Sequence, residues 1–167
     1  AGMLNSLRRE SLEQIRLARI APKQTNGRSV CAACSLPAQE KLLIVQSENL
    51  SAAKELMACG ADVFEWQPQV YREKELTRVL GENPDVQPAL VLPAVLHSDE
   101  LAHLYEWVCK NTARLSGVVA NNPGQFELKW PVPVWGGQGL NVMNAECAKF
   151  FTALGAQRLT ASCELNL

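Results

Sequence analysis

Long hydrophobic runs and an excess of charge of one sign are both missing from this sequence. A membrane-spanning helix needs roughly 20 consecutive apolar residues. No run here approaches that length, and no secretory hydrophobic segment precedes the fold. The 16 basic and 17 acidic residues give a formal net charge of -1, which gives little support for strong electrostatic binding to nucleic acid. The six cysteines lie mostly within apolar patterns, as reduced cysteines do. We therefore expect a globular protein with a cytoplasmic location.

Catalytic and metal-binding signatures are also scarce. Nucleophilic triads need a positioned base, and the only histidines are His97 and His103. Neither G-x-S-x-G nor H-E-x-x-H occurs. Cys31 and Cys34 form a single C-x-x-C without a second pair at zinc spacing, so they are either a chance surface pair or a metal or redox site. We assign no metal and no cofactor to this segment.

Short apolar runs and helical patterns alternate along most of the chain. The expected strands are 41–46, 61–66, 89–96, 117–121, 132–135 and 158–162, and the expected helices are 49–59, 69–80, 99–111 and 145–154, with one or two helical turns at 123–129. Strands joined by helices through short links are parallel, and their almost uniformly apolar character is typical of a sheet covered on both faces. The fold class is therefore α/β, with repeating β-α units.

The number of strands distinguishes two architectures. A complete (β/α) barrel has eight units and about 250 residues, whereas this chain has 167 residues, about six expected strands, and ends directly after one. The alternatives are an open doubly wound sheet and a partial or truncated TIM-like barrel, and the missing final helix favours the barrel. Residues 1–39 are expected to form an N-terminal helix, at 7–20, and a loop tether. Residues 40–167 are expected to form the barrel segment.

Three stretches are similar to one known family. The segment 139–167 contains a leucine-asparagine strand, a helix ending in leucine-glycine, and a final strand with a serine-x-glutamate-leucine exit. These elements are Leu140, Asn141, Asn144, Leu154, Gly155, Ser162, Glu164 and Leu165. Together with the sequences GVVANNPGQ at 117–125 and LNSLRR at 4–9, they resemble the collagenase-like peptidase family. Cys163 stands where that family has proline, and Pro123 stands where it has leucine.

The resemblance implies a barrel fold and a peptidase, hence a hydrolase, of which this chain is a part. It also implies an alternative, because some family members resemble oxygen-independent hydroxylases of RNA or small molecules that use a cysteine-bound iron–sulfur cluster. No matching cysteine-rich stretch is present, so such a cluster would lie outside this segment. The departure at Cys163 leaves a third interpretation, a non-catalytic accessory barrel domain.

Polar residues at strand ends are the candidate site, because the carboxyl ends of parallel strands converge on one face. We expect Glu164 to be catalytic as a general base, and Asn121, Asn141, Asn144 and Glu65 to bind substrate. Asn144 is equally well placed as a helix N-cap. The expected partners are the rest of the full-length chain, a peptide or RNA substrate, and a second copy of the chain bound through an exposed sheet edge, with no membrane.

Overall fold

The computed structural model describes residues 10–14 and 42–165. Its contacts divide the chain into units 1–39 and 40–167, and each is considered by itself. In the first unit, residues 10–14 are helical and exposed, which covers part of the helix expected at 7–20. The remainder of that helix, the predicted tether and the Cys31–Cys34 pair lie outside the described residues. No helix in the described part of the chain combines the length and apolar character that a membrane span requires.

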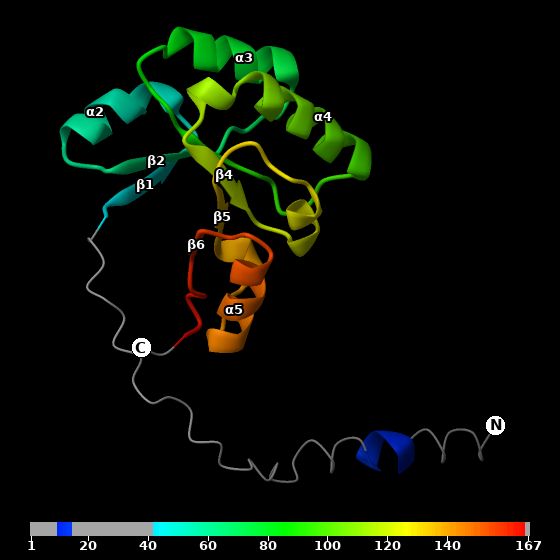
Figure 1. The fold of residues 1–167 in the computed structure, drawn as a ribbon. Helices are drawn as coiled ribbons and strands as arrows, with labels where there is room; N and C mark the ends of the chain where they lie inside the picture. Colours follow the sequence, from blue (N-terminus) through cyan, green and yellow to red (C-terminus); the bar gives the residue numbers. More distant parts are fainter. Residues whose placement is uncertain (1–9, 15–41, 166–167) are drawn as a thin grey trace. The chain divides into compact units, whose positions relative to one another are not determined.

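The second unit is built on one sheet of six parallel strands. In chain order they are β1 Ile44–Ser47, β2 Val63–Trp66, β3 Ala89–Val91, β4 Gly117–Ala120, β5 Val134–Gly136 and β6 Arg158–Leu159. Each strand pairs with its neighbour in sequence, so the order across the sheet is the order along the chain. A doubly wound sheet reverses its strand order at a switch point, and this one does not. The predicted α/β partial barrel is confirmed, since the sheet curls into a half-barrel (Figure 1).

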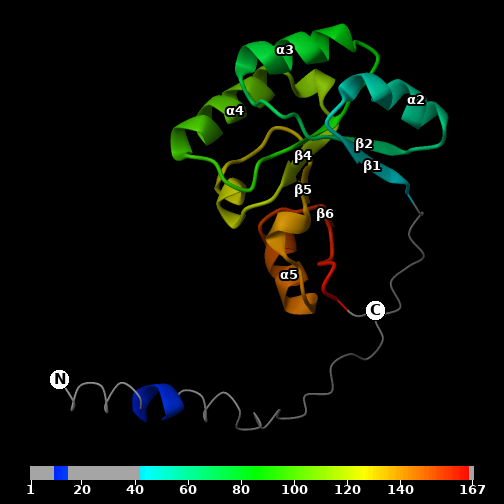
Figure 2. The ribbon, with the colours of Figure 1, turned by 180° about the vertical axis from the view of Figure 1, so that it is seen from behind.

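Helices fill most of the connections between strands. They are η1 Leu50–Ala52 followed by α2 Ala53–Ala58, α3 Glu73–Glu82, α4 Ser98–Lys110 with η2 Thr112–Arg114, η3 Pro123–Glu127, and η4 Gln138–Leu140 followed by α5 Ala145–Ala153. Figures 1 and 2 show α2, α3 and α4 on the same side of the sheet. The connection from β4 to β5 carries only the short η3 turn.

Alternation along the strands gives the sheet two different faces. Phe64 and Trp66 of β2 belong to a large buried cluster that also contains Leu76 of α3 and Trp107 of α4, so they face the helices. The residues of the opposite alternation form a separate, smaller cluster: Ala89, Val91, Val119 and Trp135. This second set lies on the concave face of the half-barrel.

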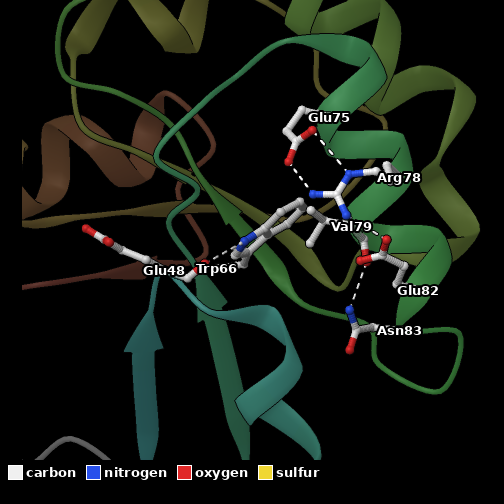
Figure 3. A network of polar contacts seen from close by, with 7 residues as sticks. All are labelled: Glu48, Trp66, Glu75, Arg78, Val79, Glu82 and Asn83. Carbon is white, nitrogen blue, oxygen red and sulfur yellow. Dashed lines mark hydrogen bonds and ion pairs between the residues drawn. The ribbon is translucent and has the colours of Figure 1, made fainter.

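Buried tryptophans connect the strand exits to the helical layer. The Trp66 indole N–H donates to the Glu48 carbonyl oxygen at 3.2 Å, which fixes the loop after β1 (Figure 3). On the outer surface of α3, Arg78 lies between Glu75 and Glu82, with a nitrogen–oxygen distance of 2.6 Å to Glu82. Such exposed pairs add little to stability, because water and salt screen their attraction. The Trp66 bond thus joins β2 to the loop after β1, whereas the ion pairs of Arg78 lie within α3 alone.

Some predicted boundaries were wrong. Helix α3 begins at Glu73 rather than 69, and it continues through Gly81 to Glu82, where Asn83 follows and its side-chain amide donates to the Val79 carbonyl at 2.8 Å. Strand β3 is three residues long and ends before Pro93, which has no N–H to continue a ladder.

Other local predictions were confirmed. Gly155 follows α5 with φ of 106°, the left-handed conformation that favours glycine after a helix. The side chain of Asn144 accepts a hydrogen bond from the Cys147 N–H at 2.9 Å, so Asn144 is the N-cap of α5.

Candidate functional site

A cavity of about 540 Å³ lies on the concave face, at the carboxyl ends of the strands. Its lining comes from strands across the sheet and from the loops that follow them: Ile44, Gln46, Glu65, Gln67, Val91, Leu92, Pro93, Ala94, Val119, Asn121, Gly137, Gln138, Gly139 and Thr160. Its size lies in the range of small-molecule sites. The carboxyl end of a parallel barrel is also where barrel enzymes hold their active sites.

Glu65 is the one ionisable side chain in this lining. It is the third residue of β2, and the alternation that buries Phe64 and Trp66 under the helices turns Glu65 to the concave face. Burial raises the pKa of its carboxyl above the usual value, and the positive charge of Arg158 partly opposes that shift. A carboxyl group with a raised pKa among neutral side chains is a candidate general acid or base.

Arg158 begins β6, and its guanidinium carbon lies 4.3 Å from the ring centroid of Trp135 on β5. The Nη1 atom is buried and donates no hydrogen bond within the described residues. The positive charge of Arg158 lowers the pKa of Glu65, although β2 and β6 are not neighbours in the sheet.

Three amide side chains connect the exits of β3 and β4. The carbonyl oxygens of Leu92, Pro93 and Ala94 accept hydrogen bonds from the side-chain nitrogens of Asn121, Gln125 and Asn122 at 2.9, 2.6 and 3.1 Å, respectively. Where the β-ladder ends, consecutive carbonyl groups thus receive side-chain donors in place of backbone donors. We call Asn121, Asn122 and Gln125 the amide clamp.

Gln125 is the centre of the amide clamp. Its side-chain oxygen accepts from the backbone N–H groups of Asn121 and Asn122, at 2.8 and 3.2 Å, and its side chain is only 2% exposed. Asn122, rather than Asn121, caps η3, through a bond from the Gly124 N–H at 2.9 Å. The sequence contained a signal for this arrangement, because an amide residue followed three positions later by glutamine is a capping box.

Asn121 lines the cavity, but the nitrogen and the oxygen of its side-chain amide both have hydrogen-bond partners within the protein. The nitrogen is bound to Leu92, and the oxygen accepts from the Gly139 N–H at 3.0 Å. A Cβ atom on Gly139 would lie 2.5 Å from the Asn121 carbonyl oxygen, so glycine is required for this close approach. Asn121 thereby joins the ends of β3, β4 and β5.

The other predicted site residues lie outside the cavity lining. Asn141 is exposed and ends η4 in the left-handed conformation, with φ of 48°. Asn144 caps α5. Glu164 is exposed in a turn after β6, where its backbone N–H donates to the Ser162 hydroxyl at 3.3 Å. The structure therefore brings Glu65 and Asn121 together, and it does not bring Asn141, Asn144 or Glu164 to the same cavity.

Sequence reasoning missed four polar residues of this region: Gln46, Gln67, Gln125 and Arg158. The side chains of Gln46 and Gln67 line the cavity and are hydrogen-bonded to each other. Period-two alternation from the buried residues Phe64 and Trp66 of β2 would have placed Gln67 on the inner face, and Gln46 is paired with the inward-facing Glu65. Within the part of the chain that the structure describes, no group of three or more histidine, cysteine or acidic residues is arranged to hold a metal ion.

The fold and site together define a partial parallel β/α barrel with a polar cavity at the carboxyl ends of its strands. Comparison with protein-family models found no matching family, and comparisons with curated proteins and with solved structures found no match.

Proposed function

We propose that residues 40–167 are the substrate-binding and catalytic segment of a barrel hydrolase that cleaves peptide bonds, a member of the collagenase-like peptidase family. The observation that carries this proposal is Glu65, the single carboxyl group of a cavity otherwise lined by neutral side chains. The resemblance of residues 139–167 to the family motif supplies the reaction class.

Glu65 has the properties that a general base requires. Its pKa is raised above the usual value for glutamate and therefore lies closer to neutral pH. Proton transfer is most efficient when the pKa of the base is near the working pH. In the proposed reaction Glu65 takes a proton from a water molecule, whose oxygen adds to the peptide carbonyl carbon. The proton then passes to the amide nitrogen as the carbon–nitrogen bond breaks, which leaves a carboxylic acid and an amine.

Glu65 is a better candidate than Glu164 for this role. Glu164 is exposed in a turn and does not line the cavity, whereas Glu65 is part-buried at its wall. The family motif drew attention to the strand exit that carries Glu164. The geometry of the half-barrel favours the acid on β2.

The remaining wall of the site would come from other parts of the full-length protein. Strands β1 and β6 each pair on one side only, and a closed barrel of this type has eight strands. Leu42, Leu43 and Ile44 are between 38% and 55% exposed at the β1 edge, as expected of residues that a further strand covers. A second copy bound at this edge is the alternative partner.

The free cysteines among the described residues, Cys59, Cys109, Cys147 and Cys163, favour a cytoplasmic location.

Hydrolysis of fluorescein-labelled gelatin by the full-length protein tests the proposal. Glu65→Gln should lower the turnover by at least about 100-fold, the usual contribution of a general base. The matched variant Glu164→Gln should stay within about twofold of the wild type, because its carboxyl group lies outside the cavity.

Two results would contradict this function. A folded Glu65→Gln variant with unchanged turnover would remove Glu65 from the mechanism. Absence of gelatin hydrolysis, together with iron and sulfide in anaerobically purified full-length protein, would instead favour the hydroxylase. Absence of gelatin hydrolysis and of iron and sulfide would favour the non-catalytic accessory domain.

A further inference from the structure

A second cavity, of about 430 Å³, lies at the amino ends of the strands. Among its lining residues, Val63 begins β2, residues 85–87 lead into β3, and Ser116 directly precedes β4. Because the strands are parallel, these segments share one end of the sheet, opposite to the end where Glu65 lines the first cavity. Within the described part of the chain, neither β1 nor β6 contributes to this lining. The second cavity is therefore distinct from the open edges of the sheet.

The wall of the second cavity is mostly apolar. It is formed by one residue of α2 and by residues at or near three strands: Met57, Val63, Phe64, Val86 and Trp135. Small-molecule sites have volumes of roughly 300–1,000 Å³ and are lined mainly by apolar and aromatic side chains, with a few polar groups that orient the ligand. The size and the lining of this cavity both fit that description.

The ring of Trp135 extends toward this end of the sheet. Its partner in the β4–β5 ladder is Val119, yet a Cβ atom on Gly117 would lie 3.4 Å from the Cε2 and Cζ2 atoms of Trp135. Gly117 is two residues nearer the amino end of β4 than Val119, so the indole runs back along the sheet. Because Cε2 is bonded to the indole nitrogen, this nitrogen lies on the ring edge beside Gly117, the neighbour of Ser116 in the sequence.

Two polar groups of this lining are unused. Trp66, Trp107 and Trp130 each donate the indole N–H to an oxygen of the protein, at 2.8–3.2 Å, whereas the N–H of Trp135 has no acceptor among the described residues. The hydroxyl oxygen of Ser116 is enclosed and likewise has no hydrogen-bond partner there. Enclosed polar groups are almost always paired, so an enclosed hydroxyl without a partner needs an explanation.

We propose that the second cavity binds a small neutral aromatic molecule that carries a carboxamide group. The ligand ring packs against the aromatic side chains of Phe64 and Trp135, as aromatic pairs do. A carboxamide offers both an acceptor and a donor, so its oxygen accepts from the Trp135 N–H and its nitrogen donates to the Ser116 oxygen. This inference does not rest on the proposed function, because it concerns a different cavity.

A charged ligand fits this cavity less well. The one cation of the lining, Lys54, already pairs with Asp85, with 3.6 Å between Nζ and Oδ2. The carboxylate of Asp62 accepts a hydrogen bond from the Leu43 N–H at 2.7 Å. An anion would meet an excess of acidic groups, and any ionised group would lose hydration against the apolar wall.

Titration of benzamide into the full-length protein, labelled with ¹⁵N at tryptophan, tests the site by NMR. The indole N–H signal of Trp135 is assigned by its loss in Trp135→Phe, and it should move on binding. The signals of Trp66, Trp107 and Trp130 should move less, because their N–H groups already have partners. Toluene, which lacks the polar group, and benzoate, which is anionic, should each bind more weakly than benzamide, on the order of tenfold.

Variants separate ligand binding from a structural role. Ser116→Ala should weaken benzamide binding about fivefold, the usual effect of one hydrogen bond. Its stability should not fall, because the hydroxyl has no partner to lose, whereas a structural hydroxyl would lower it. Ser51→Ala changes an exposed serine of η1 outside the cavity and should leave binding unchanged. Trp135→Phe should also weaken binding, and it keeps the inference testable if Ser116→Ala does not fold.

Three results would overturn the proposal. The first is a Trp135 signal that does not move at millimolar benzamide, which is also the result expected if side chains from elsewhere in the full-length chain fill the cavity. The second is equal binding of benzamide and toluene, and the third is tighter binding of benzoate than of benzamide. Gelatin hydrolysis should be unchanged in Ser116→Ala, so failure of this site and failure of the peptidase are distinguishable.

Discussion

Replacing Gln125 with alanine should be among the most destabilising single changes in the second unit. The variant loses three hydrogen bonds, two from the N–H groups of Asn121 and Asn122 and one to the Pro93 carbonyl. Each bond contributes about 1 kcal/mol net, and more when a buried partner is left unpaired. The expected loss is therefore about 3 kcal/mol in the free energy of unfolding.

Urea unfolding followed by tryptophan fluorescence measures this loss. Gln138→Ala is the matched control, because Gln138 lines the same cavity but is exposed, and its change should stay within about 0.5 kcal/mol. A loss of less than about 1 kcal/mol in Gln125→Ala would refute the reasoning that these bonds hold the strand exits together.

A second variant tests the donor role of the same side chain. Gln125→Glu keeps an acceptor for the two N–H groups but places a carboxylate oxygen against the Pro93 carbonyl. Protonation restores a donor, so the pKa of the new carboxyl group should be raised and the stability difference from the wild type should shrink as the pH falls. A difference that does not depend on pH would contradict the assigned hydrogen-bond directions.

Three further predictions concern glycine, a helix cap and Glu65. Gly139→Ala should destabilise by about 1–3 kcal/mol, because its Cβ would meet the Asn121 carbonyl oxygen. Gly81→Ala, within α3 and with no atom in the way, should instead stabilise by about 0.5–1 kcal/mol, and urea melts of the two variants would show the opposite signs. Asn144→Ala should cost about 1 kcal/mol through loss of the α5 cap, and an unchanged melt would contradict the capping role. The pKa of Glu65 is raised in the folded state, so its contribution to stability is fully present below the ordinary value of 4.5 and is lost as the pH rises through the higher folded value. Glu65→Gln should therefore remove a decline of stability with rising pH, and carboxyl titration by NMR should show the raised value directly.

The strand–helix alternation was readable from the sequence because its signals are local. Apolar runs of strand length, the glycine after α5 and the cap at Asn144 each act within a few residues, and the structure has them as predicted. The parallel direction of the strands was also predictable from the sequence. Antiparallel neighbours can be joined by a two-residue hairpin, whereas parallel neighbours need a long crossover, which is usually a helix. The boundaries of α3 were less predictable, because helical hydrogen bonds carry the chain past Gly81 at a small cost.

The composition of the site depended on long-range geometry. Arg158 on β6 lowers the pKa of Glu65 on β2 although these strands are not neighbours in the sheet, so nothing near Glu65 in the sequence indicates this effect. The same holds for Asn121, whose amide is bound to Leu92 and to Gly139, 29 and 18 positions away along the chain. The sequence by itself determined the elements and their order, since these follow from local periodicity and capping. Only the tertiary structure decided which strand-end side chains share a cavity, because that depends on the curvature and register of the whole sheet.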